Sequence, residues 1–180
     1  MLITQALCQE LRQTNYWNGL AGSAKALAIA ELSRAQNKLI VVITNSGQEA
    51  NLLIDELETF LDSDVSVPIY HFPDWETLAY DEFSPHEDII SQRLKTLNLL
   101  PKAKCGILVL PASTLLQKVC PKEFVQHYSF LMKVGDTIDL SQMQSQLESL
   151  GYHHVSEVTS HGEFAIRGSI LDVYPSGSDT

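Results

Sequence analysis

The stretch Leu39-Ile-Val-Val-Ile-Thr44 is a continuous run of apolar and β-branched residues. Runs of this kind are typical of strands that are covered on both faces, as in parallel sheets. Directly after it, Ser46 and Glu49 have the spacing of a helix capping box. The helix that they open has apolar residues at helical spacing, namely Ala50, Leu53, Ile54, Leu57 and Leu61. This succession predicts one strand–helix unit of an α/β fold.

The same alternation extends to both sides of this unit. Amphipathic or Ala-rich helices are expected at 2–13 and from about residue 26 to Ala35. A strand at 65–70 contains Pro68, which favours an edge position. A helix from Pro85 to about residue 100 then leads to a buried strand at 106–110 and a short helix at 113–119. The order predicts a P-loop-NTPase-like α/β domain, with a mostly parallel sheet and helices on both faces.

A smaller α+β domain is expected after this sheet. Short strands are predicted at 129–134, 155–158 and 164–174, with a helix that begins near Ser141 and ends at Gly151. We therefore predict an α/β domain at 1–125 and a partial α+β domain at 126–180. The final expected strand has no following partner in the sequence, which indicates a fragment of a longer protein.

Composition limits the classes of function. The 180 residues have a net charge of −10 and only 12 Lys and Arg, so a broad phosphate-binding surface is not expected and any DNA contact should be weak or absent. The three cysteines have no metal-ligand spacing, which indicates reduced thiols in a cytoplasmic protein. The sequence contains no signal peptide and no apolar run of membrane-spanning length, so we expect no membrane contact. We predict no metal site, no catalytic residue and no cofactor.

The acidic, aromatic stretch at 71–90 precedes the longest helix expected in the middle of the chain. Ser84 is a suitable N-cap, Pro85 suits the first helical position, and Glu87 is placed to complete a capping box. The simplest interpretation is a well-capped helix with a solvated acidic approach. Paired acids such as Asp74 and Glu76 could be imagined as a general acid–base pair, but no positioned nucleophile accompanies them.

A degenerate phosphate loop lies near the N-terminus. The window from Gly19 to Ala26 fits the pattern G-x-x-x-x-G-K-[ST] at Gly19 and Lys25, and Gly22 adds a glycine within the loop. Ala24 replaces the second glycine of the motif, and Ala26 replaces the hydroxyl that binds magnesium. Three interpretations remain open: a plain helix start, a vestigial loop that still attracts an anion, and a working ATPase. The two alanines disfavour the third.

Several collinear segments resemble the N-terminal, UvrB-like region of the bacterial transcription-repair coupling factor family (Mfd). The matching segments are 19–32, 72–97, 106–115, 119–121, 151–155 and 161–175. The resemblance implies a non-catalytic region that recruits UvrA to stalled RNA polymerase in transcription-coupled nucleotide excision repair of DNA. The parent protein would be an ATP-dependent DNA translocase with a polymerase-binding domain. The alternative is a UvrB-type ATP-dependent DNA-processing module, but too few residues separate Tyr70 from Ser84 for the DNA-clamping hairpin of UvrB.

Arg167 is the predicted UvrA contact. Phe164 and Ile166 should share one face of a strand, so Arg167 should point to the opposite, outward face. Gly168 beside it permits a bulge or a close backbone approach. An exposed guanidinium suits bidentate pairing with a carboxylate of a partner. The resemblance supplies the role, because the family uses the arginine of the motif Phe164-Ala165-Ile166-Arg167-Gly168 to bind UvrA.

Overall fold

A computed structural model describes residues 16–61, 67–77, 84–127, 135 and 137–175. The chain divides into two compact units with interleaved boundaries. The first unit comprises 1–74 and 102–117, and the second comprises 75–101 and 118–180. The boundary that we expected near residue 125 stays a prediction.

The first unit is built on a parallel sheet of three strands within its described residues. The strands are β1 (Leu39–Thr44), β2 (Ile69–His71) and β3 (Gly106–Pro111), in the spatial order β1-β3-β2. Leu39 pairs with Gly106 and Ile69 with Ile107, both in parallel register. The sheet confirms the α/β class. The strand that we expected at 65–70 begins only at Ile69, after Pro68, and it lies at an edge of the three-stranded sheet as predicted. The P-loop-NTPase type and the helices on both faces remain predictions.

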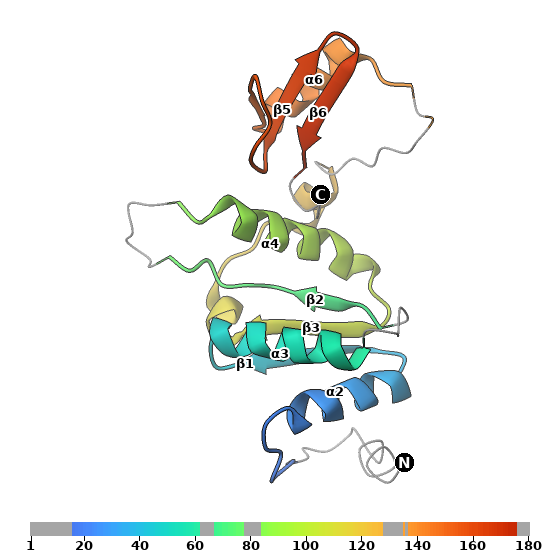
Figure 1. Cartoon of the computed structure of the whole chain (residues 1–180), viewed down its shortest axis with the longest axis vertical. Coiled ribbons are helices and arrows are strands. Elements are labelled where there is room, and N and C mark those ends of the chain that lie inside the picture. The colour runs from blue at the N-terminus through green and yellow to red at the C-terminus, as the bar shows by residue number, and fades with distance from the viewer. Residues whose placement is uncertain (1–15, 62–66, 78–83, 128–134, 136, 176–180) are drawn as a thin grey trace. The chain divides into compact units, whose positions relative to one another are not determined.

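Two helices form the core of this unit with the sheet. They are α2 (Ala24–Ala35) and α3 (Gly47–Leu61). α3 packs against all three strands, and α2 lies beside α3 (Figure 1). The core cluster consists of Ala26, Ile29, Ala30, Ala50, Leu53, Leu57, Leu61, Val67, Ile107 and Val109. The small residues Ala26, Ala30 and Ala50 are fully buried, which lets the two helix backbones approach closely. The short helix expected at 113–119 is a 3₁₀ helix, η2 (Ala112–Leu116), which begins one residue earlier and ends three residues earlier than predicted.

The expectation that β1 is covered on both faces is wrong. Val41 and Ile43 are 53% and 55% exposed, whereas Thr44 is buried. Val42, whose side chain points to the opposite face of the strand, packs against the core cluster. The central strand β3 is buried along its whole length, so the apolar run at 106–110 was interpreted correctly.

The second unit contains three α-helices and a small mixed sheet within its described residues. The elements are α4 (Glu87–Leu99), α5 (Lys122–His127), α6 (Leu140–Ser149), β4 (His153–His154), β5 (Glu163–Arg167) and β6 (Ile170–Tyr174), and η1 (Leu100–Lys102) follows α4. β4 pairs parallel with β5, and β5 pairs antiparallel with β6. Figure 1 shows β5 and β6 side by side as a hairpin. The strand expected at 155–158 is wrong, because β4 ends at His154.

Two helix starts differ from those predicted. The N-cap of α4 is His86 in place of Ser84, and its ring accepts a hydrogen bond from the backbone N–H of Asp88 at 3.3 Å. The N-cap of α6 is Asp139 in place of Ser141, and its carboxylate accepts from the backbone N–H of Ser141 at 2.9 Å. The spacing of Ile89, Ile90, Leu94 and Leu97 predicts that these residues form the buried stripe of this helix. The structure differs, because the buried residues of α4 are Ser91, Arg93 and Thr96.

Gly151 ends α6 as predicted, with a left-handed φ of 86°. The helix expected at 2–13 and the strand expected at 129–134 lie outside the described residues. Among the helices that the structure describes, none has the length and apolar character needed to cross a membrane.

Candidate functional site

The stretch at 19–26, which we predicted to be a degenerate phosphate loop, leads directly into α2. Gly19 and Gly22 have left-handed φ angles of 77° and 55°, which are accessible to glycine without strain. Ala24 is already the first residue of the helix, so a left-handed conformation, which would strain a Cβ, is not required there. Ala26 is fully buried in the core cluster. Its methyl group therefore packs inside the protein, where a magnesium-binding hydroxyl would normally face solvent or ligand.

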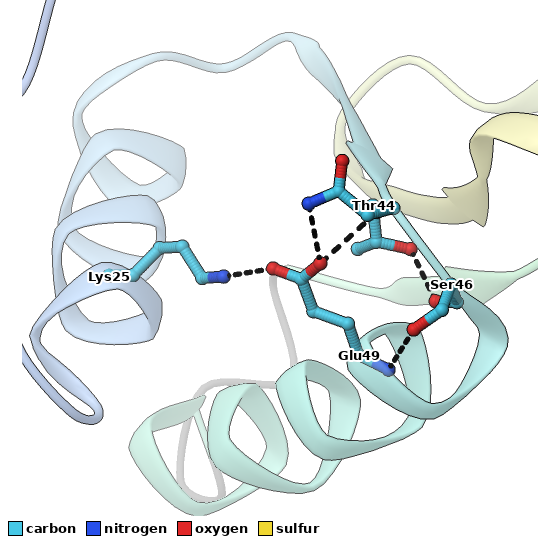
Figure 2. A network of polar contacts seen from close by, with 5 residues as sticks. Lys25, Thr44, Ser46 and Glu49 are labelled. Carbon is cyan, nitrogen blue, oxygen red and sulfur yellow. Dashed lines mark hydrogen bonds and ion pairs between the residues drawn. The ribbon is translucent and has the colours of Figure 1, made fainter.

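Lys25 forms an internal ion pair. Its Nζ lies 2.5 Å from Oε1 of Glu49 (Figure 2). The other oxygen of Glu49 accepts from the backbone N–H and the side-chain amide of Asn45, each at 3.1 Å. Ser46 Oγ accepts from the backbone N–H of Glu49 at 3.2 Å, which confirms Ser46 as a cap of α3. The reciprocal contact of the expected capping box differs, since the Glu49 carboxylate reaches Asn45 and not Ser46.

The electrostatics of this network favour a charged Glu49. The hydrogen bond from Lys25, followed by that from the backbone of Asn45, lowers the pKa of Glu49. A second carboxylate is nearby, because Ser23 Oγ donates to Glu56 Oε1 at 2.7 Å. The Ser23 hydroxyl and the Lys25 ammonium group, which could otherwise face a phosphate, therefore both contact carboxylates of the same chain. This arrangement opposes anion binding at the loop, since an added anion would meet two negative side chains.

The predicted contact residue Arg167 ends β5 at the tip of the β5–β6 hairpin. Its side chain is 65% exposed, as the strand alternation predicted, while Phe164 is fully buried. Arg167 lies opposite Ile170 in the antiparallel register. Gly168 has a φ of 62° and begins the two-residue turn between them, as expected for a type II′ hairpin turn. The bulge that we considered at Gly168 is therefore wrong.

Asp172 is the ion-pair partner of Arg167. Nη2 of Arg167 donates to Oδ2 of Asp172, which lies on the neighbouring strand two pairs further from the turn. The hydrogen bond and the charge of Asp172 raise the pKa of Arg167, and Glu157 adds a smaller effect in the same direction. The ion pair thus orients the guanidinium on an exposed face. Among the described residues only Nη2 is in contact with Asp172, so other N–H donors of the guanidinium can bind a further acceptor.

Other candidate residues occupy structural positions. Asp74 accepts hydrogen bonds from Ser113 and Gln117, which follow the central strand. The guanidinium of Arg93 lies 3.9 Å above the centroid of the Trp75 ring. His154 stacks on Phe164 with a centroid distance of 4.9 Å. Asp81, Glu82, Tyr80 and Phe83 lie outside the described residues.

Sequence reasoning missed Glu49 as the partner of Lys25, and Asp172 and Ile170 as neighbours of Arg167. A two-residue turn at Gly168-Ser169 would have placed the latter two, because it fixes the pairing of residue 167 with residue 170. The Lys25–Glu49 pair joins residues 24 positions apart, and no local sequence pattern indicates such a contact.

Comparisons with known proteins agree with this architecture. The family model of the UvrB interaction domain matches residues 130–180. The transcription-repair-coupling factor of Haemophilus influenzae is 47% identical over 155 residues, which are 86% of this chain and 13% of that protein. The factor of Escherichia coli is 43% identical over 160 residues, 89% of this chain and 14% of that protein. The Staphylococcus aureus factor is 31% identical over 157 residues, 87% of this chain and 13% of that protein.

The α/β class of the fold and the UvrB interaction domain match at residues 130–180 together indicate a UvrB-like module. The similarity over most of the chain goes further: the chain belongs to the transcription-repair-coupling factor family and corresponds to its N-terminal module. It spans about one seventh of the length of the Escherichia coli relative.

Proposed function

We propose that this module recruits UvrA to RNA polymerase stalled on damaged DNA, as the non-catalytic N-terminal region of a coupling factor. The observation that carries the proposal is the match of the UvrB interaction domain to residues 130–180, which contain the β5–β6 hairpin and the exposed Arg167. UvrA is the partner implied by the resemblance to coupling factors and to UvrB. Arg167 would contact it directly.

The proposal includes the absence of nucleotide chemistry in this module. Its support is the pairing of Lys25 with Glu49 and the burial of Ala26 in the core. ATP-driven translocation and the binding of RNA polymerase would belong to the parts of the longer protein outside this chain. With a net charge of −10, the module would contact DNA weakly or not at all. The whole assembly would work in the cytoplasm.

The direct test is a titration of purified UvrA against the chain, with Arg167→Ala in parallel. Removal of a charged anchor from an interface typically costs about 2 kcal/mol or more, which is roughly a thirtyfold loss of affinity. Lys122→Ala is the matched control, since it removes one exposed positive charge from α5 in the same unit. Binding by wild type and by the control, with a thirtyfold loss for Arg167→Ala, would support the proposal. Absence of binding by wild type would refute recruitment by this chain.

A further inference from the structure

The two faces of the β5–β6 hairpin differ in character. The antiparallel register pairs Phe164 with Val173, and Ala165 with Asp172. Because paired residues share a face and successive residues alternate, Arg167, Ile170 and Asp172 lie on the same face as Ala165. Phe164 on the opposite face is fully buried. One face of the hairpin therefore packs inside the unit, and the other carries the predicted contact residue.

Exposure on the second face is concentrated next to the turn. Ile170 is 61% exposed and lies directly opposite Arg167, whose side chain is 65% exposed. Further from the turn, Ala165 is 1% exposed. We call Arg167, Ile170 and Asp172 the hairpin-tip face. It combines a branched apolar side chain with a guanidinium, and fully desolvated apolar anchors beside arginine are frequent at the centre of protein interfaces.

The Arg167–Asp172 pair gives this face a defined shape. Asp172 is the diagonal neighbour of Arg167 across the strands, and only one guanidinium nitrogen is recorded in contact with it among the described residues. An exposed pair of this kind adds little to stability. Its consequence for binding is larger, because a side chain that is already oriented loses less conformational freedom when a partner immobilises it.

We propose that the hairpin-tip face is the docking surface of this module, with Ile170 as its apolar anchor and Asp172 as the positioning residue of Arg167. The partner surface that fits it has an apolar pocket with a carboxylate at its rim. The pocket takes the Ile170 side chain, and the carboxylate binds the guanidinium donors that Asp172 leaves available. The inference rests on the proposed function, so the occupant is UvrA.

The family match favours this occupant. The hairpin lies within residues 130–180, the range matched by the UvrB interaction domain. The net charge of −10 gives no long-range attraction to an acidic partner, so a carboxylate of the partner has to be bound by a guanidinium presented at close contact. On the hairpin-tip face, Arg167 is that group.

The experiment measures the affinity of purified UvrA for the 180-residue chain and for Ile170→Ala, Asp172→Ala and Asp172→Asn. Ile170→Ala should weaken binding about thirtyfold, as expected for loss of an interface anchor. Leu116→Ala is its control, because Leu116 is 90% exposed on η2 in the first unit. Far-ultraviolet circular dichroism and thermal unfolding establish that each variant is folded.

The asparagine variant separates positioning from general structure. Asp172→Ala frees the guanidinium and should weaken binding roughly fivefold. Asp172→Asn keeps an oxygen that accepts from Nη2 and should recover most of that loss. Glu31→Ala, which removes a carboxylate that pairs with the exposed Arg34, should leave the affinity unchanged.

The outcomes distinguish this inference from the function on which it rests. Loss of binding with Arg167→Ala, but wild-type affinity for Ile170→Ala and Asp172→Ala, would keep the proposed function and overturn the hairpin-tip face. Tighter binding by both Asp172 variants would show that Asp172 competes with the partner, and would overturn its positioning role. Absence of binding by wild type would overturn both proposals.

Discussion

The Lys25–Glu49 pair should stabilise the junction between α2 and the β1–α3 turn, and a double-mutant cycle can measure its contribution. The two side chains are 45% and 32% exposed, so solvent screens their attraction. We expect a coupling free energy of about 0.5–1 kcal/mol between Lys25→Met and Glu49→Gln at pH 7. Both substitutions keep most of the side-chain volume, and the amide introduced by Glu49→Gln retains an oxygen that can accept from the backbone N–H of Asn45.

The assay is urea-induced unfolding of wild type, both single variants and the double variant. The control cycle uses Glu31 and Arg34, an exposed pair within α2 separated by one helical turn. Helical pairs of this spacing contribute about 0.2–0.5 kcal/mol, less than we expect for Lys25 and Glu49. A coupling free energy of zero for Lys25 and Glu49, or one no larger than that of the control pair, would refute our view of the network.

The pKa of Glu49 adds a pH dependence with a definite sign. Its value in the folded protein is lowered, chiefly by the hydrogen bond from Lys25. Stabilisation by the charged carboxylate is therefore fully present above the unfolded pKa of roughly 4.3, and it is lost as the pH falls through the lower, folded value. The difference in unfolding free energy between wild type and Glu49→Gln should be constant from pH 7 to 5 and should decrease below about pH 4. If this difference in unfolding free energy stays the same below pH 4, ionisation of Glu49 is not its source.

Two further predictions concern the first unit. A fluorescent ATP analogue with magnesium should show no saturable binding up to about 1 mM. This limit corresponds to a binding free energy weaker than about −4 kcal/mol. Tight, magnesium-dependent binding in the same titration would instead support the UvrB-type alternative. Gly106→Ala should lower the unfolding free energy by roughly 3 kcal/mol or prevent folding, because its Cβ would lie 2.5 Å from the carbonyl oxygen of Pro68 at a φ of 120°. Gly47→Ala at the start of α3, where an added Cβ meets nothing within 4 Å, is the control and should be neutral or slightly stabilising in the same urea experiment.

The central elements of the first unit were predictable because their signals are local. The buried run at 106–110 and the helical spacing of Leu53 and Leu57 predicted β3 and α3. The exposure of Val41 and Ile43 was not predictable, since residues 39–43 are all apolar and both faces of the strand therefore look alike in the sequence. Which face is covered depends on packing against distant segments.

Ser46 caps α3 as predicted, but two other helix starts differ from those expected. His86, which caps α4, lies two residues after the expected Ser84, and Asp139, which caps α6, lies two residues before the expected Ser141. In both cases the N-cap is a residue other than the serine that we expected. Its side-chain nitrogen or oxygen accepts a hydrogen bond from a backbone N–H of the first helical turn. A choice between neighbouring caps depends on where the helix packs, which the local sequence leaves open.

Arg167 shows which part of a site the sequence can supply. Alternation along β5 was sufficient to predict an outward side chain, because it depends only on the positions of Phe164 and Ile166. The neighbours of Arg167 across the hairpin depend on the length of the turn, and the bulge that we considered at Gly168 would have given a different register. The role of Arg167 in binding is still a prediction that rests on the family resemblance.

The two cations of the candidate sites differ in what surrounds them, and this difference explains their proposed roles. Lys25 is held by Glu49, whose carboxylate also accepts from Asn45, so releasing the lysine would leave a carboxylate fixed beside the loop. Arg167 is held by a single carboxylate at the end of an exposed hairpin, and its planar group can bind a second acceptor without leaving the first. An anion that binds Lys25 must displace the Glu49 carboxylate, whereas a partner's carboxylate that binds Arg167 can share the guanidinium with Asp172. In our proposal, the same kind of contact therefore disfavours ligand binding at the predicted phosphate loop and prepares the hairpin for a partner.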